Sequence, residues 1–92
     1  MSWNYRLVHR FDEVLQEHVY AIHEAYYDEG SRKPHSISEN PSYPQADTWE
    51  GFTHDFARYQ RGYLQPRREI LEYADFDKRA ERPTAETEAT HE

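Results

Sequence analysis

The stretch HVYAIHEAYYDEGSRKPHSISENPSYP, residues 18–44, has the pattern of a β-hairpin followed by an extended crossover. Residues 18–27 alternate and carry apolar or aromatic side chains on both faces, which is typical of a central strand. Polar turn formers at 28–34 then lead to a short alternating segment at 35–39. Because Pro34 and Pro41 cannot donate to a strand ladder, we expect the next strand of the hairpin to lie between them.

Another strand is predicted ahead of this hairpin, at residues 3–9. Its sequence, WNYRLVH, alternates with a period of two. One face carries Trp3, Tyr5 and Leu7, and the other carries Asn4, Arg6 and Val8. Residues 10–17 contain neither Gly nor Pro, and they fit a wide loop or a short helical turn.

An amphipathic helix is predicted after the crossover. Asp47 precedes Glu50 by three residues, which is the spacing of a capping box, and Thr48 is an alternative cap. The aromatic residues that follow are spaced three or four positions apart and form one stripe: Trp49, Phe52, Phe56, Tyr59 and Tyr63. We expect the strands to bury this stripe and Pro66 to end the helix.

The C-terminal part of the chain has weaker patterns. Residues 67–76 fit neither period cleanly and could form a short second helix or an extended arm, of which we favour the helix. From residue 77 onward the only apolar side chains are alanines, so burial cannot offset the entropy of ordering this segment. The predicted fold is α+β in the order β-β-β-α: a three-stranded antiparallel sheet with one amphipathic helix packed on one face. We expect one domain at 1–76 and a disordered acidic tail at 77–92.

Composition limits the classes of protein that fit. The chain has 92 residues, of which 36% are hydrophobic and 15% aromatic, so one small core rich in large rings is expected. It has no cysteine, which excludes disulfides and thiolate chemistry, and it has no long apolar run. These features predict a cytoplasmic protein that does not bind membranes.

The charge balance favours a protein partner. The formal net charge of −7 opposes attraction to phosphate backbones, so we expect no direct binding of nucleic acid. The same charge would accelerate association with a basic surface on another protein.

Residues with catalytic chemistry are present but poorly placed. In a regular strand, His23 and Glu24 point to opposite faces, and a buried structural hydrogen bond is the simplest role for Glu24. No nucleophile motif and no phosphate-binding glycine loop occurs. We therefore predict no catalytic residue, no metal ligand and no cofactor. A metal site built from His9, His35 and His54 is the remaining alternative.

Four short motifs suggest a family: WNYR at 3–6, AIHEAYYDEG at 21–30, SENP at 38–41 and DTWE at 47–50. Together they resemble a group of small uncharacterised bacterial proteins over residues 3–65. That resemblance implies a shared fold and brings no activity with it. The order of strands and helix is also similar to the N-terminal domain of HicB-type antitoxins, which block a toxin. Such antitoxins usually add a C-terminal DNA-binding segment, where this chain has an acidic tail.

Two functions follow as hypotheses. The first is a non-catalytic, acidic protein-binding module that inhibits its partner, as an antitoxin or a phage anti-defence factor does, or that forms a homodimer. Its predicted interface residues are Tyr26, Tyr27, Asp28, Glu29 and Tyr43, because one helix is too small to cover all the tyrosines. The alternative is a small metal-dependent hydrolase or nuclease that uses a His and carboxylate cluster.

Overall fold

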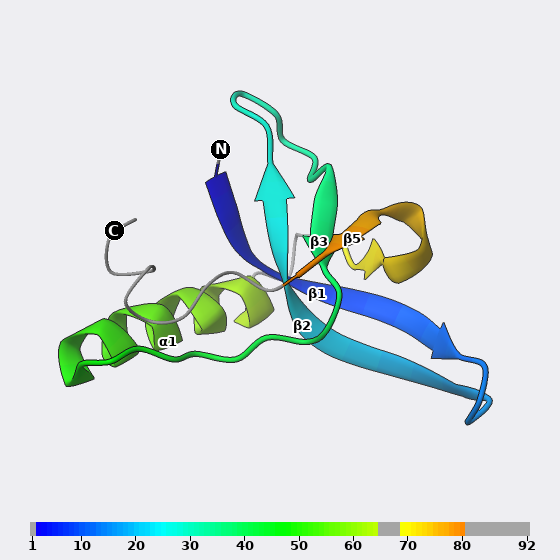
Figure 1. Ribbon diagram of the computed structural model, residues 1–92, viewed down its shortest axis with the longest axis horizontal. Helices are drawn as coiled ribbons and strands as arrows, with labels where there is room; N and C mark the ends of the chain where they lie inside the picture. Colours follow the sequence, from blue (N-terminus) through cyan, green and yellow to red (C-terminus); the bar gives the residue numbers. More distant parts are fainter. Residues whose placement is uncertain (1, 65–68, 81–92) are drawn as a thin grey trace.

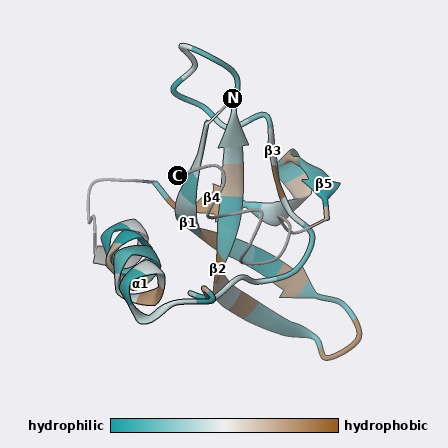
Figure 2. Ribbon diagram, turned by 60° about the vertical axis from the view of Figure 1, so that its left-hand side comes forward, coloured by the Kyte–Doolittle hydropathy of each residue, from teal (hydrophilic) through white to brown (hydrophobic). Residues whose placement is uncertain are grey.

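The described part of the chain contains five strands, one α-helix and one 3₁₀ helix. The computed structural model describes residues 2–64 and 69–80. The elements are β1 (Ser2–Asp12), β2 (Glu17–Tyr27), β3 (Ser36–Ser38), α1 (Trp49–Leu64), β4 (Leu71–Glu72), η1 (Tyr73–Asp75) and β5 (Asp77–Arg79). Figures 1 and 2 show α1 on one side of the long β1–β2 hairpin and β3 with β5 on the other.

The β1–β2 hairpin is the scaffold of the fold. The two strands pair antiparallel along their whole length, from Ser2 opposite Tyr27 to Asp12 opposite Glu17. Both strands are therefore confirmed, but the predicted loop or helical turn at 10–17 is wrong. The strands continue to a tight turn at 13–16, in which the Asp12 carboxylate accepts the backbone N–H groups of Val14 and Leu15, at 3.0 and 3.1 Å.

The hairpin predicted at 18–39 is confirmed. β3 pairs antiparallel with β2, with Ile37 opposite Ala25 and Ser36 opposite Tyr26. The connecting loop contains a turn in which Ser31 N–H donates to the Asp28 carbonyl at 3.0 Å. β2 therefore lies between two partners, as the apolar character of both its faces indicated.

The sheet is larger than predicted. It has five strands of mixed direction in the order β4-β1-β2-β3-β5, with β4 parallel to β1 and β5 parallel to β3. The prediction of a three-stranded antiparallel sheet is therefore wrong, and so is disorder at 77–79. The favoured second helix is wrong over residues 69–76, where a short strand and one 3₁₀ turn occur, and residues 67 and 68 lie outside the described part. β4 and β5 have only two and three residues, which is too short for a sequence period to be recognised. β4 pairs with β1, and β5 pairs with β3. Residues 81–92 of the predicted tail lie outside the described part.

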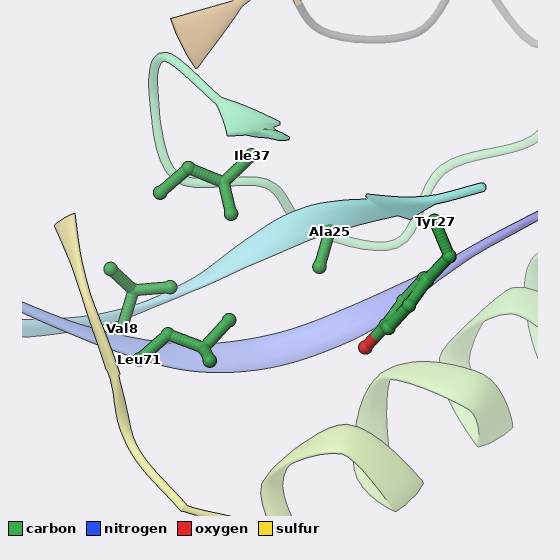
Figure 3. Close-up of a cluster of buried hydrophobic side chains, with 5 residues drawn as sticks. All are labelled: Val8, Ala25, Tyr27, Ile37 and Leu71. Atoms are coloured by element: carbon green, nitrogen blue, oxygen red, sulfur yellow. The ribbon is translucent and has the colours of Figure 1, made fainter. Parts of the chain in front are cut away.

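The sheet must be strongly curved, because its two edge strands are close together in sequence. In a flat sheet the first and fifth strands would lie about 19 Å apart, at about 4.8 Å per step. Glu72 and Asp77 are five steps apart, which is at most about 18 Å even when fully extended. Three of those residues form η1, which shortens the connection further. Inside the curve lies the core cluster in Figure 3: Val8, Ala25, Tyr27, Ile37 and Leu71.

The helix α1 begins and docks through polar contacts. Thr48 Oγ1 accepts the N–H of Gly51 at 3.0 Å, so Thr48 is the cap that the helix uses. Tyr5 of β1 donates its hydroxyl to the buried Asp55 carboxylate at 2.8 Å, and its ring meets the Tyr59 ring edge to face at 5.1 Å. The predicted end of the helix at Pro66 lies outside the described residues.

The expected burial of the whole aromatic stripe is wrong. Tyr59 packs on Tyr5, but Trp49 is 73% exposed and Phe56 is 43% exposed. The face of the helix that meets β1 carries Asp55 and Tyr59. Trp49 and Phe56 therefore point away from the contact with β1. The side chain of Tyr63 is not among those described.

We predict that Gly62→Ala destabilises the fold. A Cβ at Gly62 would lie 2.4 Å from the carbonyl oxygen of Tyr5, so α1 would have to move off β1. We expect a net loss of about 1–3 kcal/mol in the free energy of unfolding, measured by denaturant titration, although alanine favours a helix by about 1 kcal/mol.

The matched control is Gly51→Ala in the same helix. Its Cβ would lie 3.0 Å from the capping Thr48 Oγ1 and 3.1 Å from the Ala46 Cβ, so these neighbours need to move by only a few tenths of an ångström. We expect a clearly smaller loss than for Gly62→Ala. Equal effects of the two substitutions would contradict the close contact at Tyr5.

Candidate functional site

An exposed row of stacked rings lies on the first half of α1. We call Trp49, Phe52 and Phe56 the aromatic ridge. Adjacent ring centroids are 6.2 and 6.1 Å apart, with interplanar angles of 22° and 12°. The stacking holds the three rings as one surface. Since Trp49 is largely exposed and Phe56 is partly exposed, the ridge presents an apolar area to solvent.

The ridge lies in an acidic segment. Residues 39–57 contain four acidic residues and neither Lys nor Arg. Asp47 and Glu50, next to Trp49, are both exposed. The negative charge favours a partner whose surface is basic.

A second exposed apolar surface lies at the tip of the β1–β2 hairpin, where Figure 2 shows a hydrophobic turn. Val14 is 91% exposed and Leu15 is 63% exposed. These aliphatic side chains sit on a turn and stack on nothing that is described, so ordering them at an interface would cost more entropy than docking the rings. The tip is therefore the weaker candidate and a useful comparison site.

Two of the predicted interface residues are buried. Tyr26 and Tyr27 are only 6% and 7% exposed, so the expectation that they form a surface is wrong. The Tyr26 hydroxyl donates to Glu24 at 2.5 Å, and the Tyr27 hydroxyl accepts from Arg6 at 2.9 Å. The curved sheet and its two additional strands bury both rings. The predicted sheet of three strands lacks these strands, so it left the two tyrosines exposed.

The other three predicted interface residues are on the surface. Tyr43 is 66% exposed, and Asp28 and Glu29 lie in the exposed loop between β2 and β3. Asp28 also lies 3.4 Å from the His35 ring. The structure does not bring these residues together with the aromatic ridge through any described contact.

His23 and Glu24 are structural. The His23 ring lies 2.9 Å from the carbonyl of Ser38, and the Ser38 hydroxyl accepts the Glu24 N–H at 3.1 Å, so the two strands are tied together. The Glu24 carboxylate accepts a hydrogen bond from the Tyr26 hydroxyl. The buried hydrogen bond predicted for Glu24 is therefore present.

Two other histidines form a chain of contacts on the surface. His9 Nδ1 lies 2.6 Å from Glu72, and His9 Nε2 lies 2.9 Å from His18 Nδ1. These contacts tie β4 to both strands of the hairpin. Within residues 2–64 and 69–80, no three His, Asp or Glu side chains are placed to hold a metal, and His35 and His54 do not join His9.

A basic cavity is the feature that sequence reasoning missed. It is lined in part by Arg6, Arg32 and Lys33. Arg6 shares a face of β1 with Asn4 and Val8. A charged residue on the same strand face as an apolar one was the signal in the sequence that could have indicated this cavity. The aromatic ridge was missed for another reason, because its residues were predicted to be part of the core.

We predict that Tyr26 supports the fold and that Tyr43 does not. Tyr26→Phe removes a donor to a buried carboxylate, which should lower the free energy of unfolding by about 1.5–3 kcal/mol in denaturant titration. Tyr43→Ala alters an exposed ring and should leave it within about 0.5 kcal/mol. A neutral Tyr26→Phe, or a costly Tyr43→Ala, would contradict these assignments.

Comparison of the chain with protein-family models, with curated proteins and with solved structures gives no match. The resemblances to small bacterial proteins and to HicB-type antitoxins therefore stay predictions. None of the helices in the described part of the chain has the length and apolar character needed to cross a membrane.

Proposed function

We propose that this protein is a non-catalytic binding module that docks through its aromatic ridge on the basic surface of a partner protein. The observation that carries the proposal is the exposed, stacked row of Trp49, Phe52 and Phe56. Aromatic side chains, Trp above all, are enriched among the residues that dominate binding energy at protein interfaces. Rings already fixed by stacking lose little further freedom on docking.

Charge supports a basic partner. The net charge of −7 steers the chain toward positive surfaces, and the acidic residues beside the ridge would face them at close range. Association should therefore slow as salt is added, because exposed charges are screened beyond about 8–10 Å at physiological ionic strength.

Inhibition of the partner is the form of binding we propose. A rigid ridge that covers a functional basic surface blocks it without chemistry, as an antitoxin or a phage anti-defence factor would. A cytoplasmic location belongs to the same proposal, since the chain carries no cysteine. The alternative of a metal-dependent hydrolase has no cluster of three ligands to support it in the described ranges.

We predict that substitution of ridge residues weakens capture of the partner. The full chain, expressed at native level and purified, should retain one partner in stoichiometric amount at low salt. Trp49→Ala and Phe56→Ala should each weaken that complex at least about tenfold, the size of a loss of about 1.4 kcal/mol at an interface anchor. Calorimetry with the purified partner measures the loss.

The control is Leu15→Ala at the hairpin tip, which alters another exposed apolar side chain. It should leave the affinity unchanged. Three outcomes would refute the proposal: no stoichiometric partner, full binding by both ridge variants, or an equal loss with Leu15→Ala. A homodimer that the ridge variants disrupt would make the partner a second copy and would contradict the basic-surface assignment.

A further inference from the structure

A cavity of about 850 Å³ lies between the first half of β1 and the loop that joins β2 to β3. Strand β1 lines it with Ser2, Asn4 and Arg6, and the loop lines it with Arg32 and Lys33. Its volume is within the range of about 300–1,000 Å³ that small-molecule sites occupy. The side chains of Asn4 and Arg6 alternate with the residues that meet α1, so the cavity opens on the other face of β1.

Arg6 is a buried cation without a counter-charge in the described structure. Its side chain is 7% exposed, and its two terminal nitrogens donate to neutral acceptors, the Tyr27 hydroxyl and the Glu69 carbonyl, each at 2.9 Å. Among residues 2–64 and 69–80, the ion pairs involve other side chains, and no carboxylate pairs with Arg6. Buried charges in proteins are normally paired, so an anion bound in the cavity would supply the counter-charge for Arg6.

The rest of the lining is positive as well. Arg32 and Lys33 are exposed at the mouth, and Glu69 is the one acidic residue among the described residues that line the cavity. Three cationic groups thus meet one carboxylate in a chain whose net charge is −7. Such a local concentration attracts a small anion, whereas the overall charge repels a long polyanion.

A neutral group adds a donor for the ligand. The Tyr27 hydroxyl accepts from Arg6, so its own proton can be donated to a ligand oxygen beside the guanidinium. A ligand that uses both donors carries an oxyanion with several acceptor oxygens.

We infer that this cavity binds a small phosphomonoester, such as a sugar phosphate. A phosphoryl group has three terminal oxygens, which can accept from Arg6, from the Tyr27 hydroxyl and from the loop cations together. A carboxylate has only two oxygens to share among these donors. The volume of about 850 Å³ exceeds that of a phosphate group, so the organic part of the ester also has room in the cavity. The site is independent of the proposed docking role of the aromatic ridge, which lies on the other side of β1.

Titration of the isotopically labelled full chain, followed by NMR, tests the site. Ribose 5-phosphate should shift the Arg6 side-chain signal and the amide signals of residues 31–34, ribose should not, and inorganic phosphate should bind more weakly than ribose 5-phosphate. Arg32→Gln and Lys33→Gln should each weaken binding about three- to tenfold, as loss of one charge-assisted contact does. Both positions are exposed, so the variants should fold.

The matched control is Arg61→Gln, which removes the same charge from an exposed position on α1 outside the cavity. It should change the affinity less than about twofold, as a distant screened charge does. Absence of shifts with both phosphate probes, or an equal loss with Arg61→Gln, would overturn the site. Tighter binding of a phosphoserine peptide than of ribose 5-phosphate would assign the cavity to phosphorylated proteins and overturn the small-molecule assignment.

Discussion

The contact of Tyr5 with α1 determines how the helix lies on the sheet. The Tyr5 hydroxyl donates to Asp55, its ring meets Tyr59, and its backbone carbonyl lies so close to Gly62 that no side chain fits between them. Asp55 also accepts the backbone N–H of Gln45, so the segment before the helix is tied to the same carboxylate. A buried polar anchor of this kind is directional, and it fixes the rotation of the helix as well as its position.

The two candidate sites lie on opposite sides of β1, and the rotation of α1 determines the first of them. The anchored face of α1 is centred on Asp55 and Tyr59, which leaves the aromatic ridge to one side and exposed. The same helix covers the edge of β1 near Tyr5, where β4 does not reach, and so protects it from pairing with other chains. On the opposite face of β1, Val8 joins the core while Arg6 faces the basic cavity. One strand thus separates a surface suited to a protein from a cavity suited to a small anion.

The sequence predicted the parts of the fold that follow from local periodicity. Residues 3–9 and 18–27 alternate over many positions, and β1 and β2 form there; Thr48 was one of two proposed caps. β4 and β5 have two and three residues, so only their pairing with distant strands reveals them. The burial of Tyr26 and Tyr27 depends on the same long-range curvature. The spacing of the aromatic residues predicted the helix correctly. It did not predict which face of the helix meets the sheet, because that depends on the hydrogen bond between Asp55 and Tyr5.

Nuclear Overhauser effects in the full chain give the most direct test of this arrangement. We predict cross-peaks from the Tyr5 ring to the Tyr59 ring and from the Tyr5 Hβ protons to Gly62 Hα, together with cross-peaks from Trp49 only to rings and residues near it on α1. Cross-peaks from the Trp49 or Phe56 ring to side chains in the middle of β1 or β2 would show that the aromatic stripe is buried, and would contradict both the anchor and the exposed ridge.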